Sequence, residues 1–237
     1  MTSEKDMELW SLYQADFDKI GKSEENIVIV EKFLEEDHRV KIVDYLNTHR
    51  DDPEFSGGKS LRYVEVKEEN PEVADLIKLY EKKMFDVVKK NFIEKYDIKM
   101  FEKPWNELHF IKWSPTMGSG LHSDCQYPNG DPLMKSNYYK LNITALIYPN
   151  DDYTGGHIQF PDYDLDIKPE AGDLVMFPAN NYYNHIVTEV EEGIRYTMPI
   201  WWTFDNGAPE RQMNYNPEDS KGLWVNEGED TSHLRSY

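Results

Sequence analysis

The sequence predicts a mainly β fold with α additions (α+β), in which a double-stranded β-helix, or jelly roll, is supported by N-terminal helices. Two observations favour it. From about residue 100 the chain consists of short runs of β-forming residues separated by glycine, proline and aspartate. Before that point, apolar residues recur mostly at helical spacing. Short strands between turns are typical of antiparallel jelly rolls rather than of parallel βαβ units.

The N-terminal part of the chain predicts a mixture of helices and strands. Residues 4–20 have the apolar spacing of a short amphipathic helix, and the β-branched run 27–30 predicts a strand. A second helix is expected over 35–49 and a second strand over 62–67. The segment 51–61 contains a proline, two glycines and several charges, so we expect a mobile loop there.

The most regular helical pattern spans 71–96. Asn70 is a preferred N-cap residue, and Pro71 fits the first helical position. The apolar residues that recur at helical spacing behind them are Val73, Leu76, Ile77, Tyr80, Met84, Val87 and Val88. We expect this face to pack against one sheet of the β domain and to carry nothing catalytic.

The remaining segments complete the expected domain. Strands are predicted at 107–113, 120–124, 138–148, 156–160, 163–168, 173–177, 184–190 and 194–204. The last part of the chain is polar with few apolar residues, so it is expected to lie along the surface or to be partly disordered. We therefore expect a single domain over 1–237, with helical and strand support in 1–100, the double-stranded β-helix in 101–204, and a polar C-terminal extension in 205–237.

Charge and cysteine content restrict the possible partners and compartment. The formal net charge of −19 argues against nucleic-acid backbones and anionic membranes as main partners. The single cysteine, Cys125, excludes an internal disulfide framework and is compatible with a reducing compartment. The polar N-terminus has no apolar run behind it, and no segment has the length of a membrane span. We expect a soluble, intracellular, cytoplasmic protein whose oligomeric state the sequence leaves open.

The candidate metal ligands are His122, Asp124 and His185. A histidine and an aspartate two residues apart in an extended segment point to the same side, so one strand end can supply both. Two imidazoles and one carboxylate are the set that holds ferrous iron on one face. A second His-x-Asp pair, at 49–51, closes the expected helix 35–49 and reads as a solvated helix end. His109 and His157 are the alternatives to His185.

The arginine that follows His185 is the candidate anchor for an acidic cosubstrate. Arg195 opens an apolar strand, and its planar guanidinium can grip a carboxylate with two parallel bonds. Thr197 shares its face and could add another bond. Tyr148, at the end of the strand 138–148, could donate to the same carboxylate or be a core tyrosine.

Three aromatic residues are candidates for the substrate pocket. Trp201 lies on the Arg195 face by alternation, and Trp113 precedes the first ligand by nine residues. Either could equally be a core residue. Tyr127 belongs to the turn-rich segment 125–132, which, like 51–61, could cover the open face of the metal or form an ordinary surface connection.

Together these residues resemble the Fe(II)/2-oxoglutarate-dependent dioxygenase superfamily, and within it the prolyl 4-hydroxylase-like branch. The resemblance covers about residues 107–204. The segments that carry it, in order, are His122-Ser123-Asp124, Leu146-Ile147-Tyr148-Pro149-Asn150, Gly155-Gly156, Phe160-Pro161, Gly172-Asp173-Leu174-Val175-Met176-Phe177, His185 and Gly193-Ile194-Arg195-Tyr196.

The resemblance implies a role for each of these residues. His122, Asp124 and His185 would hold Fe(II), Arg195 would bind the distal carboxylate of 2-oxoglutarate, and Tyr148 would assist it. The implied cofactors are Fe(II), 2-oxoglutarate and O₂, with ascorbate as a candidate addition. Trp113 departs from the pattern, because it stands near where relatives often carry a tyrosine.

The resemblance also implies an activity, which is hydroxylation of a prolyl residue in a peptide or protein substrate, with release of succinate and CO₂. Asp124 favours hydroxylation, since related halogenases are expected to lack this carboxylate. Two alternatives stay open: hydroxylation of another side chain or a free amino acid, and a jelly-roll binding protein without turnover.

Overall fold

The computed structural model describes residues 4–52, 55, 60–127, 129–133 and 138–206. Its N-terminal elements are α1 (Glu4–Ile20), a 3₁₀ turn η1 (Glu24–Asn26), β1 (Val28–Val30), α2 (Glu36–Thr48), β2 (Ser60–Leu61), α3 (Tyr63–Glu69), α4 (Pro71–Val88), the π-helical turn η2 (Lys89–Ile93) and α5 (Glu94–Tyr96). The later elements are β3 (Phe110–Trp113), β4 (Ser119–His122), η3 (Tyr138–Lys140), β5 (Ile143–Ile147), β6 (Thr154–Gly155), β7 (Ile158–Phe160), η4 (Pro161–Tyr163), β8 (Leu165–Ile167), β9 (Leu174–Pro178), η5 (Asn181–Tyr183), β10 (His185–Val187), β11 (Val190–Glu192) and β12 (Arg195–Trp202).

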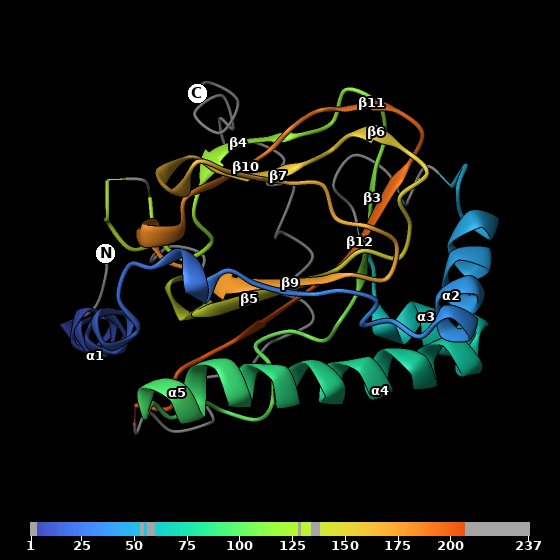
Figure 1. The fold of residues 1–237 in the computed structure, drawn as a ribbon. Helices are drawn as coiled ribbons and strands as arrows, with labels where there is room; N and C mark the ends of the chain where they lie inside the picture. The colour runs from blue at the N-terminus through green and yellow to red at the C-terminus, as the bar shows by residue number, and fades with distance from the viewer. Residues whose placement is uncertain (1–3, 53–54, 56–59, 128, 134–137, 207–237) are drawn as a thin grey trace.

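Two antiparallel sheets face each other, and the helices cover the outer face of the larger one. The larger sheet has the strand order β1-β9-β5-β12-β3-β2, and the smaller has the order β4-β10-β7-β8. A short ribbon pairs β11 with β6. In Figure 1 the long helix α4 runs below the larger sheet, while β4, β10 and β7 lie above it. This is the mixed α+β arrangement with antiparallel sheets that the sequence predicts.

Alternation along the strands divides the apolar residues into two cores. Ile143, Ala145 and Ile147 of β5 belong to the core between the larger sheet and the helices. Leu146 packs against a second core between the two sheets, to which its partner in the strand register, Val175 of β9, belongs. The space between the inner faces of the two sheets, called the lumen below, is where side chains of both sheets meet.

The helical predictions hold for three long segments. The predicted helix 4–20 coincides with α1, and 35–49 is observed as α2. The predicted helix 71–96 is helical throughout, although a π turn separates α4 from α5. Asn70 caps this helix as expected, because its side-chain oxygen accepts a hydrogen bond from the Val73 amide at 3.2 Å.

The strand predicted over 62–67 is wrong, because these residues begin helix α3. Val64 and Val66 alternate in the sequence like strand residues, but Val66 is fully buried whereas Val64 is 49% exposed. The Arg62 amide donates to the Glu65 carboxylate at 2.8 Å, which satisfies a backbone group that a helix start leaves free. Packing against α4 then decides the conformation.

Smaller differences concern strand ends. The predicted strand 138–148 starts with a 3₁₀ turn and is extended only as β5, and the predicted strand 184–190 divides into β10 and β11. In the segment 51–61, β2 pairs with β3 and Phe55 is buried against Tyr196, while 53–54 and 56–59 lie outside the described residues. Most of the predicted C-terminal extension, 207–237, also lies outside them. In the described part of the chain, no helix combines the length and apolarity needed to cross a membrane.

Candidate metal centre and anion pocket

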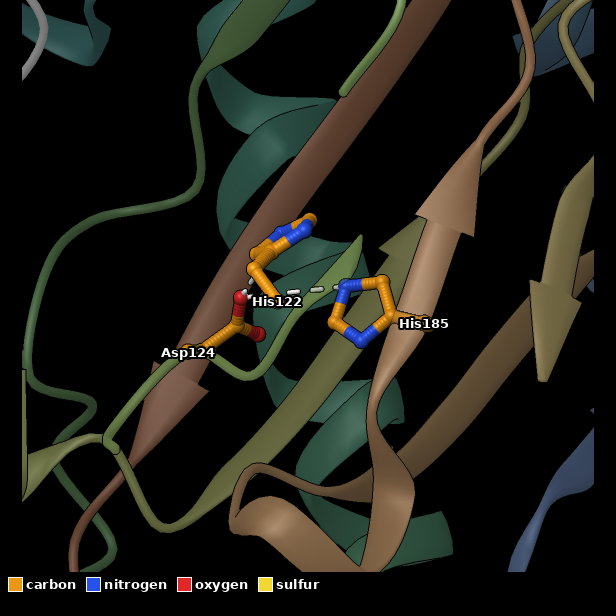
Figure 2. Close-up of side chains that lie close together, drawn as sticks. All are labelled: His122, Asp124 and His185. Atoms are coloured by element: carbon orange, nitrogen blue, oxygen red, sulfur yellow. Dashed lines mark ion pairs between the residues drawn. The ribbon is translucent and has the colours of Figure 1, made fainter. Parts of the chain in front are cut away.

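Two neighbouring strands of the smaller sheet bring the predicted metal ligands together. His122 ends β4, Asp124 follows two residues later, and His185 begins β10 directly opposite His122 in the strand register. Figure 2 shows the carboxylate pointing towards both imidazoles. Asp124 Oδ1 lies 3.6 Å from His122 Nε2 and 3.9 Å from His185 Nε2, and one donor atom from each of the three residues lies within 4.8 Å of the others.

Backbone carbonyls orient both imidazoles. His122 Nδ1 lies 2.8 Å from the Gly120 carbonyl, and His185 Nδ1 lies 3.1 Å from the Tyr183 carbonyl. A carbonyl can only accept, so each Nδ1 carries a hydrogen and each Nε2 keeps its lone pair towards Asp124. Burial and the neighbouring His122 lower the pKa of His185 to about 4, which keeps it neutral at ordinary pH.

The Asp124 carboxylate is held ionised. Burial alone would raise its pKa, but the neighbouring histidines and hydrogen bonds from Thr144 and Trp201 hold the pKa below its usual value. Two neutral imidazoles and one carboxylate on one side of a space are the ligand set of mononuclear Fe(II) sites with open positions. The three residues therefore fit such a metal, and in the described part of the chain no other group of three has this geometry.

A buried arginine lies in the same lumen, and no anionic group among the described residues pairs with it. Arg195 is 1% exposed at the start of β12, and its guanidinium carbon lies 5.0 Å from the centre of the Trp113 ring and 5.1 Å from that of Tyr148. Its Nε and Nη1 have no hydrogen-bond partner among the described residues. A buried charge held between two aromatic faces, with free donors, is costly unless an anion completes it.

Two tyrosine hydroxyls share this situation. The hydroxyls of Tyr148 and Tyr153 are buried and have no hydrogen-bond partner among the described residues. Burial raises the pKa of Tyr148 to about 12 and also raises that of Tyr153, although the nearby Arg195 charge opposes both shifts. Both hydroxyls are therefore protonated donors. Together with Arg195 they form what we call the anion pocket.

Thr197 and Trp113 support the same pocket. Trp113 pairs with Arg195 across β3 and β12, and its Nε1 donates to Thr197 Oγ1 at 3.0 Å. Because this oxygen acts as an acceptor, its own hydrogen remains able to donate to a ligand. The indole of Trp113 thus orients Thr197 while its face lies against the arginine.

Trp201 and Tyr127 lie in different surroundings. Trp201 Nε1 donates to Asp124 Oδ2 at 3.0 Å, so this tryptophan contacts a predicted metal ligand directly. Tyr127 is 42% exposed, and among the described residues it has no hydrogen bond or ring contact with His122, Asp124 or His185. The sequence predicts Trp201 as a wall residue of the substrate pocket, whereas the structure shows it hydrogen-bonded to Asp124.

Three further histidines, His49, His109 and His157, lie outside the cluster. His109 is buried beside Trp201, and burial lowers its pKa to about 4. His157 pairs with Asp166 at 2.9 Å, and His49 pairs with Glu69 at 2.8 Å. None of the three contributes to the group that could hold a metal.

Sequence reasoning missed two residues that the structure places in these sites, Thr144 and Tyr153. Thr144 Oγ1 donates to Asp124 Oδ2 at 2.5 Å. Thr144 lies at even spacing from Tyr148 along the same strand, so alternation could have placed both in the lumen. Tyr153 follows a turn after this strand, where no periodic signal indicates its direction.

The comparison with known sequences supports this geometry. The sequence profile of the 2OG-Fe(II) oxygenase superfamily matches residues 108–203. Human prolyl 3-hydroxylase 2 is 34% identical over 73 residues, which are 29% of this chain and 10% of that protein. A PKHD-type hydroxylase of Cupriavidus pinatubonensis is 30% identical over 97 residues, covering 39% of this chain and 40% of the relative. The chain thus spans well under half the length of these curated relatives.

Solved structures support the fold. A prolyl hydroxylase from Trichoplax adhaerens, in complex with a peptide fragment of the hypoxia inducible factor oxygen degradation domain, aligns with a TM-score of 0.59 at 15% identity, over 90% of this chain and 99% of that one. A prolyl-4-hydroxylase from Pseudomonas putida aligns with a TM-score of 0.56 at 17% identity, over 81% and 98% of the two chains. These likenesses confirm the predicted jelly roll. The part of the chain that matches the 2OG-Fe(II) oxygenase profile, residues 108–203, contains the His-Asp-His cluster and Arg195.

Proposed function

We propose that this protein is an Fe(II)- and 2-oxoglutarate-dependent dioxygenase that hydroxylates a prolyl residue of a peptide or protein and releases succinate and CO₂. One observation carries the proposal. The lumen holds both a His-Asp-His cluster and a buried arginine that has free donors among the described residues. A metal held by the cluster could bind the keto acid end of 2-oxoglutarate, and the Arg195 guanidinium could bind its distal carboxylate.

The protein's part in the metal site is to fix three ligands and leave room beside them. His122, Asp124 and His185 would hold Fe(II), which when bound supplies the positions where the keto acid and O₂ react. The two Nδ1 hydrogen bonds keep both imidazoles in the tautomer that presents Nε2.

The anion pocket would bind the distal carboxylate of 2-oxoglutarate. Arg195 offers a planar fork of donors, and the hydroxyls of Tyr148 and Tyr153 add two neutral ones. Thr197 is positioned by Trp113 to add a further donor. Because water is largely excluded here, these bonds orient the cosubstrate strongly.

A prolyl residue within a peptide is the proposed substrate class. The matched relatives include prolyl hydroxylases, and one of the structural neighbours is complexed with a peptide fragment. The net charge of −19 favours a neutral or basic peptide over an acidic one. Tyr127 is sufficiently exposed to contact such a peptide.

The proposal is tested by substrate-dependent turnover of 2-oxoglutarate. Purified protein is incubated with Fe(II), 2-oxoglutarate, O₂ and ascorbate, first alone and then with a panel of proline-containing peptides. Succinate release and addition of one oxygen atom to the peptide are measured, and omission of ascorbate tests its part. We expect both products to require His122 and His185, whereas His49→Ala, in the other His-x-Asp pair, should behave like the unaltered protein.

The outcomes separate the alternatives. Oxygen addition to a non-prolyl side chain or to a free amino acid would keep the oxygenase assignment and replace the substrate. Tight binding of Fe(II) and 2-oxoglutarate with no succinate release under any condition would indicate a binding protein. Loss of activity in His49→Ala but not in His122→Ala would refute the ligand set.

A further inference from the structure

We propose that Thr144 and Trp201 are positioning residues that hold Asp124 as a one-oxygen metal ligand. The inference rests on the proposed function in one respect, namely that the His-Asp-His cluster binds a divalent metal. It concerns how the protein controls the number of coordination positions that the Asp124 carboxylate would occupy on the metal.

The two carboxylate oxygens of Asp124 have different neighbours. Oδ1 is the oxygen that faces the two imidazoles. Oδ2 accepts one hydrogen bond from Thr144 Oγ1 at 2.5 Å and another from Trp201 Nε1 at 3.0 Å. Hydrogen bonds to an ionised acceptor are roughly twice as strong as those between neutral groups. Rotation of Oδ2 towards a metal would break both of these hydrogen bonds. They therefore hold the carboxylate in the orientation in which Oδ1 faces the imidazoles.

The register of the larger sheet creates this pair of donors. Thr144 of β5 and Trp201 of β12 are directly opposite each other in the antiparallel pairing of the two strands. Side chains of such a cross-strand pair project from the same face of a sheet. Asp124, in contrast, follows β4 of the smaller sheet. The two hydrogen bonds therefore tie the ligand of one sheet to a matched pair on the other.

Trp201 is itself held in place by its surroundings. Its backbone amide donates to Asn106 Oδ1 at 3.3 Å, and its carbonyl accepts from the Trp105 amide at 2.8 Å. Its indole lies 6.2 Å, between ring centres, from the buried His109. The donor that contacts Asp124 is thus part of an ordered group rather than a free side chain.

The chemical consequence is an open metal face. A carboxylate can occupy one or two positions on a divalent ion, and a second bond from Asp124 would take a position that a chelating keto acid or O₂ needs. With Oδ2 engaged, the three protein ligands would contribute one atom each to a bound ion. The remaining half of a six-coordinate site would then stay open.

The test uses Mn(II), a six-coordinate probe that reports bound water through the relaxation of water protons. Thr144→Val removes the hydroxyl but keeps the shape, Thr144→Ser restores a hydroxyl, and Trp201→Phe removes the other donor but keeps an aromatic ring. Thr203→Val is the matched control, because Thr203 is a fully buried threonine that donates to the Lys140 carbonyl at 2.6 Å and does not touch Asp124. A cooperative thermal unfolding transition is measured for each variant as the check that it is folded.

We expect Thr144→Val and Trp201→Phe to weaken Mn(II) binding by about 10–100-fold, the usual effect of removing a group that orients a metal ligand. The water relaxation enhancement per bound Mn(II) should also fall by about a third, which is one of three open positions. Thr144→Ser should recover both values, and Thr203→Val should leave them unchanged.

Two results would overturn the inference. One is a Thr144→Val variant that matches Thr203→Val in both affinity and relaxation. The other is weaker binding with unchanged relaxation in Thr144→Val and Trp201→Phe alike, because Asp124 would then bind through one oxygen without the two donors. Absence of Mn(II) binding in the unaltered protein is a separate result, which would refute the proposed metal site and the inference with it.

Discussion

Gly156 lies directly against the side chain of Arg195. A Cβ atom at position 156 would stand 2.8 Å from Arg195 Cδ, and the glycine has a φ of +63°. The absence of a side chain therefore serves two purposes, the left-handed backbone and the space for the arginine.

Gly156→Ala should weaken 2-oxoglutarate binding on the order of 10–100-fold. The added methyl group would displace the Arg195 side chain, so that its guanidinium could no longer form two parallel hydrogen bonds to the carboxylate. Calorimetric titration of the Mn(II)-loaded protein without O₂ measures this. Gly21→Ala is a matched control, since Gly21 also has positive φ, at +69°, but its Cβ would meet nothing closer than 3.9 Å. Equal affinity in the two variants would contradict the role assigned to Gly156.

Arg195→Ala should cost about 2–5 kcal/mol of 2-oxoglutarate binding, the usual effect of truncating one partner of a buried charged pair. Arg195→Lys should be intermediate, because a point charge lacks the planar fork. The loss should disappear for 2-oxobutyrate, a keto acid without the distal carboxylate. A similar loss for both acids would show that Arg195 acts on the fold rather than on the carboxylate.

Tyr153→Phe should weaken 2-oxoglutarate binding by roughly 1.5–3 kcal/mol, the contribution of a hydrogen bond to a charged group. Tyr148→Phe should do the same, since both hydroxyls are buried without a hydrogen-bond partner among the described residues. Tyr163→Phe is the control, because its hydroxyl donates to the Tyr182 carbonyl outside the pocket. The prediction is wrong if Tyr153→Phe binds like Tyr163→Phe.

The metal-free protein should lose stability as the pH falls from about 6.5 towards 4. His109 is buried, and burial lowers its folded pKa to about 4, whereas an unfolded histidine titrates near 6.5. In this window the unfolded state binds the proton and the folded state does not, so acid favours unfolding. This contribution reaches about 2–3 kcal/mol at the acid end.

Urea unfolding of the unaltered protein and of His109→Gln at pH 8, 6 and 5 measures the effect. The substitution removes the titrating group. As the pH falls, the unfolding free energy of the unaltered protein should therefore decrease more than that of His109→Gln. At pH 8 both states are neutral at this position, and only the packing difference remains. A difference that is constant with pH would contradict the prediction.

The sequence by itself determined the features that depend on short-range spacing. His122 and Asp124 share one side because they are two residues apart in extended chain, and Arg195, Thr197 and Trp201 share a strand face by the same rule. The helix after Asn70 follows from a cap and a long apolar repeat. These signals are local, so they can be interpreted from the sequence without knowledge of the fold.

The tertiary structure decided whatever depends on contacts between distant segments. Residues 62–67 alternate like a strand but form α3, because packing against α4 outweighs a weak local preference. Trp201 binds Asp124 across 77 residues of sequence, and Thr144 joins it only through the register of β5 and β12. Strand register and the approach of two sheets are set by the whole core, and no local spacing encodes them.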